Sequence, residues 1–180
     1  FQFDPVVAVV PRVYFVVAWY SQFSPESDPW GAVMLRRFSA DGTPLDPVEL
    51  QANTYTTGNQ AAASVAVAPD GSFIVVWWSD GSIGSDQDLS SIQGRRYAPN
   101  GSPLDAAEFQ VNRFTGSYQS YPSVAVNAEG DSVVAWDSFE SGGGDDSDTS
   151  TQVRRFRSDG TAIDAEEFQV NTYTTSWQGA

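Results

Sequence analysis

The tetrapeptide Phe109-Gln110-Val111-Asn112 occurs again 59 residues later as Phe168-Gln169-Val170-Asn171, and 59 residues earlier in the related form Leu50-Gln51-Ala52-Asn53. Paired arginines, glycine turns and tryptophans recur in the same phase: Arg36-Arg37, Arg95-Arg96 and Arg154-Arg155; Asp41-Gly42-Thr43, Asn100-Gly101-Ser102 and Asp159-Gly160-Thr161; Trp19, Trp77 and Trp136. A fixed period shared by four features indicates tandem copies of one structural unit. The chain divides into repeat 1 (1–53), repeat 2 (54–112), repeat 3 (113–171) and the start of a further linker (172–180).

Each repeat is predicted to form four short strands. In repeat 2 these strands are Ser64 to Ala68, Phe73 to Trp78, Ser91 to Tyr97 and Glu108 to Asn112. The turn between the first two contains Asp70-Gly71, in which glycine supplies the positive φ of a tight hairpin. Because no stretch shows the apolar period of a capped helix, we expect helix to be nearly absent.

The side chains of the strands indicate how the sheets are arranged. The first strand alternates Val and Ala, which are small enough for a crowded centre. The second is apolar on both faces, as in a sheet covered on both sides, and the fourth alternates apolar and polar residues. This gradient favours β-propeller blades, whose sheets converge on an axis; a β-solenoid and a pair of packed sheets are the alternatives. We predict an all-β fold of three four-stranded antiparallel propeller-type blades, open or part of a larger propeller.

The ends of the chain depart from the repeat. Phe1-Gln2-Phe3 resembles the fourth-strand motif, yet Val7-Ala8-Val9 follows too soon, and Pro11-Arg12 replaces the hairpin turn. Both ends look cut from a longer array. Propellers typically have about four to eight blades, and an open array leaves apolar faces exposed. We expect the chain to belong to a longer polypeptide or to associate with other copies of itself or other subunits of a larger assembly, two chains giving a six-bladed ring.

Composition limits the partners. The chain has 23 acidic residues against 9 basic ones, all of them arginine, and a net charge of −14. Such a surface repels nucleic acid and anionic lipid. No apolar run approaches the roughly 20 residues that span a bilayer. The sequence therefore argues against nucleic-acid binding and membrane insertion.

The polar loop between the second and third strands carries clusters of acidic residues in repeats 2 and 3, whereas repeat 1 offers only Glu26 and Asp28 there. The candidate calcium ligands are Asp86 and Asp88 in repeat 2 and Asp145, Asp146 and Asp148 in repeat 3. Carboxylates interspersed with Gly and Ser can surround Ca²⁺, which takes six to eight oxygen ligands. The spacing does not match an EF-hand, and acidic surface loops are usually only solvated. No cofactor is required by the sequence, and calcium is the one these loops suggest.

Aromatic residues at strand ends and in linkers suggest a glycan as the small-molecule partner. The candidates are Trp30, Trp78, Tyr121 and Trp177. Flat aromatic rings stack on sugars, and nearby polar groups bind hydroxyls. The alternative is that aromatic residues pack between neighbouring blades, which we expect of the recurring tryptophans. Trp30 and Trp78 do not recur in phase and are the better sugar candidates.

The paired arginines suggest either an anion site or a structural ion pair. One arginine at a fixed place in every repeat is more typical of pairing with an acid on the neighbouring strand. The second arginine of each pair is the expected structural member. Its expected partner is Asp46, Asp105 or Asp164, or the nearby Glu49, Glu108 or Glu167.

The residue content excludes several kinds of catalysis. Without His, Cys or Lys the chain cannot form a Ser-His-Asp triad, a thiol nucleophile, a Schiff base or a His-ligated metal site. A two-carboxylate glycosidase remains a remote alternative. That chemistry needs a unique pair of acids, whereas most acids here lie in repeated positions or loops. We therefore expect no catalytic residues and no enzymatic activity.

The repeat resembles the tandem repeats of large secreted or surface bacterial proteins with units of the form EFQVNTYTT…PSVAV…DG…VVVW…G.RF. The matching elements are Glu167 to Thr175, Pro122 to Val126, Asp70-Gly71, Ile74 to Trp77 and Gly94 to Tyr97. The resemblance implies a propeller-like, non-catalytic module, extracellular or on the bacterial cell surface. We expect a structural scaffold or protein-interaction surface; the alternative is a lectin-like or calcium-dependent adhesive module.

Overall fold

The computed structural model describes residues 1–22, 29–140 and 149–172, and within them every regular element is a β-strand. The first blade contains β1 (Gln2–Val10), β2 (Tyr14–Ser21), β3 (Ala32–Ser39) and β4 (Leu50–Gln51). The second contains β5 (Gln60–Val67), β6 (Phe73–Asp80), β7 (Ser90–Tyr97) and β8 (Phe109–Gln110). The third contains β9 (Gln119–Val126), β10 (Ser132–Phe139), β11 (Thr149–Phe156) and β12 (Phe168–Gln169).

Each blade is an antiparallel sheet whose strands follow chain order. The hairpin between β5 and β6 turns at Gly71, whose φ of 86° is the conformation expected of its Asp-Gly sequence. The carboxylate of Asp70 accepts a hydrogen bond from the Ser72 N–H at 2.8 Å. Gly71 N–H donates to the Ala68 carbonyl at 2.9 Å, which closes the turn.

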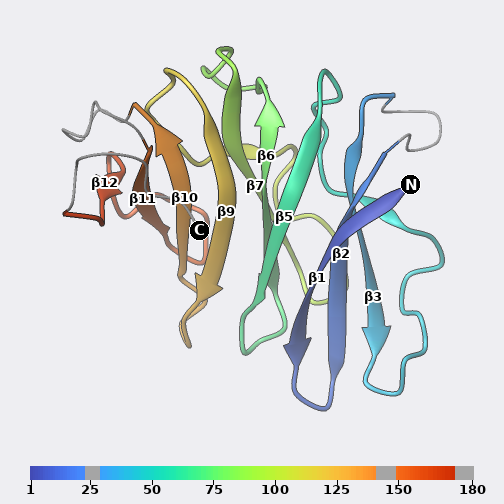
Figure 1. Cartoon of the computed structure of the whole chain (residues 1–180). Helices are drawn as coiled ribbons and strands as arrows, with labels where there is room; N and C mark the ends of the chain where they lie inside the picture. Colours follow the sequence, from blue (N-terminus) through green and yellow to red (C-terminus); the bar gives the residue numbers. More distant parts are fainter. Residues whose placement is uncertain (23–28, 141–148, 173–180) are drawn as a thin grey trace.

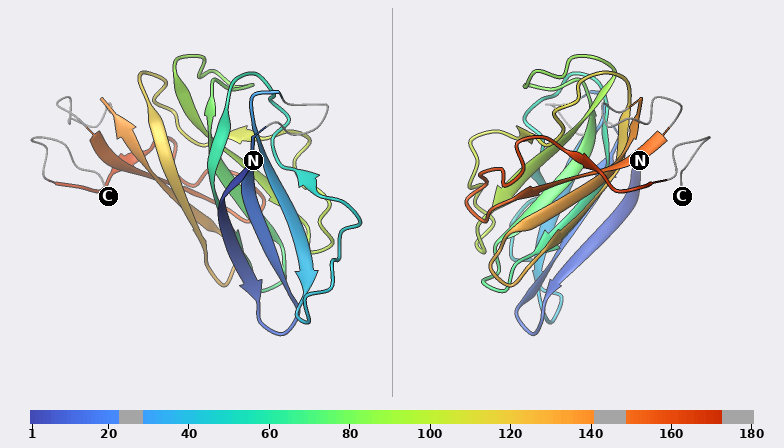
Figure 2. Two further views of the ribbon diagram at one scale, coloured as in Figure 1. Left: turned by 45° about the vertical axis from the view of Figure 1, so that its right-hand side comes forward. Right: turned by 90° about the vertical axis from the view of Figure 1, so that its left-hand side faces the viewer.

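The blades stack through their faces. β5 contacts both β1 and β9, so the first strands of the three blades lie next to one another (Figure 1). The sheets follow one another as a fan from the first blade to the third (Figure 2). The small Val and Ala residues of the first strands therefore occupy the inner edge of the fan, as the sequence predicts.

Two apolar clusters fill the spaces between the blades. The cluster between the first and second blades includes Val16, Leu35, Phe73, Val75 and Trp77. The cluster between the second and third includes Ile74, Val76, Val111, Val134 and Trp136. Successive residues of β6 thus enter opposite clusters, which explains why that strand is apolar on both faces. The predicted fold class is confirmed: each repeat is one four-stranded propeller-type blade.

Two sequence expectations need correction. Phe1-Gln2-Phe3 is not a fourth strand, because Gln2 and Phe3 begin β1 and pair with Ser21 and Tyr20 of β2. Gln2 occupies the position of Gln60 in the second blade, where a glutamine also begins the first strand. The fourth strand is also shorter than expected and contains only Phe109–Gln110. Its ladder ends there because the Asn112 side chain accepts the Ile92 N–H at 2.8 Å in place of a backbone carbonyl.

The paired arginines are structural. The second arginine of each pair forms an ion pair with the predicted aspartate: Arg37 with Asp46, Arg96 with Asp105 and Arg155 with Asp164. The first arginine also joins blades, since Arg95 donates to the Ala52 carbonyl at 3.0 Å and Arg154 to the Val111 carbonyl at 2.8 Å. The arginines that recur in the sequence therefore hold each blade together and tie it to its neighbour.

A glutamate completes each junction. Glu108 accepts the backbone N–H groups of Thr54 and Tyr55, at 2.8 and 2.6 Å, from the linker that precedes its blade. Glu167 accepts those of Arg113 and Phe114 in the same way, at 2.8 and 2.6 Å. Hydrogen bonds between charged groups and backbone amides are stronger than neutral ones. These contacts fix the position of one blade relative to the next.

None of the described segments forms a helix of the length and apolar character needed to cross a membrane.

Candidate functional site at the loop end of the innermost strands

The two ends of the blades differ in structure. At one end, short turns join the first strand to the second. At the other end, the chain passes from the second strand to the third, for example through residues 81–89, and from one blade to the next, for example through residues 111–118. We call this second end the loop end, and the metal and sugar candidates that the structure describes, Asp86, Asp88, Trp30, Trp78 and Tyr121, belong to it.

Each innermost strand has the same irregularity near the loop end. Two residues of the first strand lie opposite the recurring tryptophan of the second strand: Asp4-Pro5 opposite Trp19, Ala62-Ala63 opposite Trp77 and Tyr121-Pro122 opposite Trp136. The first residue of each bulge has a positive φ, of 48° at Asp4 and 49° at Ala62 and Tyr121. Positive φ is unfavourable for a residue with a side chain, and bulges of this kind occur next to active sites, where they redirect side chains.

The bulge repeats in the backbone but not in the side chain. Its first residue is an acid at Asp4, a methyl group at Ala62 and a phenol at Tyr121. The residue after the recurring tryptophan also varies, since Asp137 takes the place of Tyr20 and Trp78. Asp4 and Asp137 are therefore carboxylic acids that occur once each, at the loop end, in positions that the repeat leaves free to differ. A catalytic site needs this kind of asymmetry.

The acids at this end differ in their environments. Burial raises the pKa of the Asp137 carboxyl, with no neighbouring group opposing the shift. Burial also raises the pKa of Asp86, to about 6, although a hydrogen bond from the Asn112 side chain works in the opposite direction. Asp4, by contrast, is exposed on β1. Acids whose surroundings shift their pKa values are candidates for proton transfer near neutral pH.

The predicted calcium ligands divide into two groups. Asp86 is fully buried, and its carboxylate accepts hydrogen bonds from the Asn112 side chain at 2.6 Å and the Asp88 N–H at 3.3 Å. Asp145, Asp146 and Asp148 lie outside the described residues. In the part of the chain that the structure describes, no group of three or more acids is placed to hold a metal ion. Calcium binding stays a prediction.

The predicted sugar-stacking residues also differ in accessibility. Tyr121 at the third bulge is 72% exposed and Trp30 before β3 is 64% exposed. Trp78 is half-buried and packs against the apolar cluster between the second and third blades. Trp177 lies outside the described residues. Tyr121 is the aromatic ring best placed to meet a ligand at the inner edge of the blades.

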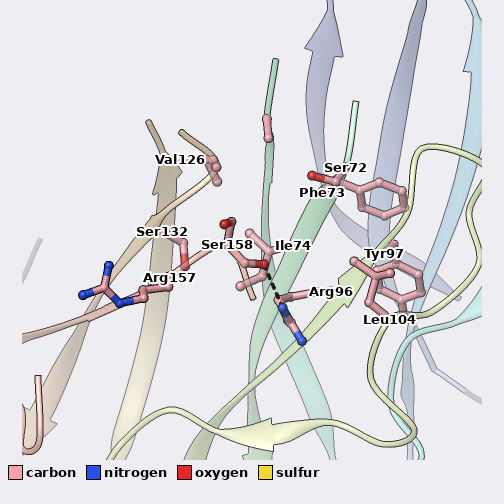
Figure 3. A pocket seen from close by; sticks show the side chains of 12 residues that line it. Ser72, Phe73, Ile74, Arg96, Tyr97, Leu104, Val126, Ser132, Arg157 and Ser158 are labelled. Atoms are coloured by element: carbon pink, nitrogen blue, oxygen red, sulfur yellow. Dashed lines mark hydrogen bonds between the residues drawn. The ribbon is translucent and has the colours of Figure 1, made fainter. Parts of the chain in front are cut away.

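A separate hollow lies at the opposite end, between the turns of the second and third blades (Figure 3). Arg96 crosses it and donates a hydrogen bond to the Ser158 carbonyl at 2.8 Å. Its other lining residues include Phe73, Tyr97 and Ser132, and none is an acid. This hollow belongs to the junction between the blades and lacks the groups that acid–base chemistry requires.

Asp4 and Asp137 were missed as site candidates by the sequence reasoning. The signal was present as a break in the repeat: alignment on the tryptophan phase places Asp4 with Ala62 and Tyr121, and Asp137 with Trp78. These positions stand out only in the structure, where the strand register shows a bulge opposite each recurring tryptophan. Most acids of this chain lie in repeated positions or loops, whereas Asp4 and Asp137 lie on strands at positions where the repeats differ.

No family model matches the sequence, and no curated protein matches it. Solved structures do resemble it. A Hadza microbial sialidase has a TM-score of 0.62 at 10% identity, over 94% of this chain and 37% of its own. An α-L-arabinanase of Penicillium chrysogenum, complexed with arabinobiose, has a TM-score of 0.57 at 12% identity, over 94% of this chain and 45% of its own. A thermostable family-43 glycoside hydrolase has a TM-score of 0.54 at 13% identity, over 99% of this chain and 60% of its own.

At these identities the likeness reports a shared fold. The chain spans between 37% and 60% of the length of these three proteins. Their fold supports the assignment of the three sheets as propeller blades.

The same neighbours overturn the expectation of a non-catalytic scaffold or interaction module without enzymatic activity, because blades of this kind occur in enzymes that act on glycosides. The expectation rested on the absence of His, Cys and Lys and on the observation that most acids lie in repeated positions or loops. Glycoside hydrolysis needs only two carboxyl groups, and Asp4 and Asp137 are acids outside the repeated positions.

Proposed function

We propose that this chain is a glycoside hydrolase unit of the propeller type, acting on neutral glycans, with Asp4 and Asp137 as its catalytic acids. The observation that carries the proposal is the position of these two carboxyl groups. Each stands where the repeat is broken, at the loop end, and Asp4 lies on a bulge of an innermost strand. The fold shared with a sialidase, an arabinanase and a family-43 glycoside hydrolase supports it.

The two acids have different roles in this proposal. Asp137, whose pKa burial raises, holds its proton to higher pH and donates it to the oxygen of the departing sugar. Asp4 is exposed and acts in the same reaction either as the base that takes a proton from the attacking water or as the nucleophile that forms a bond to the anomeric carbon. The separation of the two carboxyl groups with substrate bound decides between these last two routes.

The charge of the protein restricts the substrate. A net charge of −14 repels sugars that carry carboxylates or sulfates. Arg37, Arg96 and Arg155 form ion pairs with aspartates of their own blades. These arginines therefore do not form a cluster that could bind an anionic sugar. Neutral sugars need hydroxyl contacts and an aromatic surface, and the exposed ring of Tyr121 supplies such a surface. The resemblance to secreted bacterial repeats supports action outside the cell.

The test is hydrolysis of a panel of neutral and acidic aryl glycosides and oligosaccharides. We expect activity on a neutral member of the panel. Asp4→Asn and Asp137→Asn should each lower kcat by about 10²–10⁴-fold, the usual contribution of a positioned acid or base. Asp41→Asn, in an exposed turn at the opposite end, is the matched control and should leave kcat unchanged. Absence of hydrolysis across the panel, or full activity in both variants, would refute the proposal.

A further inference from the structure

The outer faces of the first and third blades are exposed where the equivalent residues of the second blade are buried. On the third blade, Val133 is 37% and Val170 is 54% exposed, whereas their counterparts Ile74 and Val111 are 4% and 0% exposed. On the first blade, Val7 and Val9 are 60% and 61% exposed. Their counterparts Val65 and Val67 are partly buried and pack against the cluster between the first two blades.

The exposed face of the third blade and the exposed face of the first blade correspond to the two surfaces that meet wherever neighbouring blades pack within the chain. In the middle of the chain, the face that carries Ile74 and Val111 receives the third blade, and the face that carries Phe73 and Val75 receives the first. The outer face of the third blade is of the former kind. The outer face of the first blade, with Phe15 and Val17, is of the latter. The same contact has already formed twice within the chain.

The polar groups of the junction also lack their contacts to a neighbouring blade at the two outer faces, among the described residues. Arg37 and Arg96 each donate a hydrogen bond to a carbonyl in the next blade, that of Pro99 or Ser158. Arg155, the third member, has a 52% exposed side chain and bonds only to Asp164 among the described residues. The carbonyl equivalent to those of Pro99 and Ser158 on the first blade belongs to Ala40.

The glutamate of the junction shows the complementary pattern. Glu108 and Glu167 bind the N–H groups that begin the preceding linker. Glu49, their counterpart in the first blade, is exposed and makes no hydrogen bond to another described residue. The residue that corresponds to Thr54 and Arg113 at the other end of the chain is Thr172, which follows the third blade. Each end of the chain thus presents the groups that the other end requires.

We propose that the third blade of one chain docks on the first blade of a second copy, and that two such contacts close a six-bladed ring. The surface consists of Val133, Phe168 and Val170 on one side and Val7, Val9 and Trp19 on the other, with Arg155 facing the Ala40 carbonyl and Glu49 facing the Thr172 N–H. Six blades lie within the usual range for propellers. Head-to-tail contacts make a closed assembly when their rotation returns to the start.

The ring also brings the two proposed catalytic acids to the same junction, a step that rests on the proposed function. At the junction of the second and third blades, the start of β9 lies next to β7, because the Ser90 hydroxyl accepts the Gln119 N–H. The far part of β9 lies next to β5, because the Ser64 hydroxyl accepts the Val124 N–H. Its bulge at Tyr121 therefore crosses β6, the strand that carries Trp78. The corresponding positions at the new junction are Asp4 of one copy and Asp137 of the other.

Mass measurement tests the docking without any assumption about activity. By light scattering after size exclusion, the chain should have twice its mass of 19.5 kDa. Val170→Glu places a charge in the docked face and should weaken association by at least about 100-fold. Its circular dichroism should be unchanged, because Val170 is exposed in the single chain. Ile83→Glu, at a 50% exposed loop residue of the second blade, is the matched control and should keep the double mass. A single-chain mass for the unmodified protein would overturn the proposal.

Cross-linking tests the direction of docking. The chain has no cysteine, so introduced thiols are unique. Because Ser64 contacts Val124 within the chain, the corresponding pair across the ring is Ser123 of one copy and Val7 of the other. The doubly substituted Ser123→Cys, Val7→Cys protein should form covalent dimers under oxidation, and neither single variant should. Dimers from either single variant, or none from the double one, would overturn head-to-tail docking.

Mixing experiments separate the ring from the shared site. If each site uses Asp4 of one copy and Asp137 of the other, mixing inactive Asp4→Asn and Asp137→Asn chains should restore about a quarter of the activity after subunit exchange, since half of the dimers then carry one intact site of two. Restoration supports the shared site. Double mass without restoration refutes the shared site and leaves the ring intact, whereas single mass refutes the ring whatever the activity.

Discussion

The Nη1 atom of Arg37 in the first blade donates a hydrogen bond of 2.6 Å to the carbonyl oxygen of Pro99 in the turn of the second blade. The same guanidinium forms an ion pair with Asp46 in its own blade. Arg96 repeats the arrangement with Asp105 and the Ser158 carbonyl. One side chain therefore joins the third strand of a blade to the segment that leads to the fourth strand, and also joins two blades of the fan. This gives a physical reason for an arginine at this position in every repeat.

Arg37→Ala should lower the free energy of unfolding by about 3–5 kcal/mol, the usual cost of removing one member of a buried ion pair. Arg37 and Asp46 are only 6% and 5% exposed, so Asp46 would be left as a buried charge without its partner. Removing both charges in an Arg37→Met, Asp46→Leu variant should cost less. Urea denaturation followed by tryptophan fluorescence measures both. Equal losses for the single and double variants would contradict this account.

Arg155→Ala is the matched control for the contact between blades. Arg155 keeps the equivalent aspartate partner, Asp164, but contacts no following blade among the described residues. In a Val170→Glu background, which keeps chains apart, the substitution should destabilise the protein much less than Arg37→Ala does. A loss as large as that for Arg37→Ala would show that the bond to Pro99 contributes little.

Ala62→Gly should raise the stability of the protein by up to about 1 kcal/mol, because Ala62 has a φ of 49° and only glycine adopts this conformation without steric cost. Ala61→Gly, one residue earlier in the regular ladder opposite Trp78, should lower stability by about 0.5–1 kcal/mol. Thermal unfolding of the two variants would show opposite shifts. Destabilisation by both would indicate that the strain at the bulge is not relieved by glycine.

Asp86→Asn should change how stability depends on pH. Because the pKa of Asp86 is raised from 3.8 to about 6 in the folded protein, the folded state binds this proton more tightly than the unfolded state does. The contribution of Asp86 to stability is therefore fully present below about pH 4 and is lost as the pH rises through 6.

Relative to the unmodified protein, Asp86→Asn should gain about 2 kcal/mol between pH 4 and pH 7.5. Denaturation curves at these two pH values measure the gain. Asp88→Asn removes one charge from the same loop at an exposed position and serves as the control. A pH-independent difference for Asp86→Asn would show that its carboxyl is not held protonated by burial.

Val111→Ala and Val170→Ala compare one motif position in two settings. Val111 is 0% exposed between the second and third blades, so its truncation should cost about 2 kcal/mol through lost burial and a residual cavity. Val170 is 54% exposed in the single chain, so its truncation should cost little intrinsic stability and should instead weaken association of two copies. Chemical denaturation and sedimentation separate the two effects. A fall in intrinsic stability at Val170 equal to that at Val111 would contradict the comparison.

Much of the fold could be predicted from residues 109–112 and their copies, because a repeated unit must fold the same way each time and β-strand patterns are local. The pairing of Arg37 with Asp46 was also predictable, since both recur at fixed positions in each repeat, although Asp46 lies in the connection between β3 and β4 rather than on a strand. The site was not. Asp4 and Asp137 are far apart in sequence, and a bulge that gives a position its importance depends on the register of two strands, which the sequence pattern alone does not fix.

The number of repeats, the four strands in each and the alternation of apolar residues follow from local periodicity and turn chemistry, and can therefore be read from the sequence. Which faces of the blades are covered depends on the packing of one blade against the next. Val111 and Val170 stand in identical motifs, yet one is buried and the other is exposed, because burial depends on the presence of a neighbouring blade rather than on the residue itself. The tertiary structure also showed that the repeat changes its side chains at the loop end of the innermost strands, where the backbone stays the same.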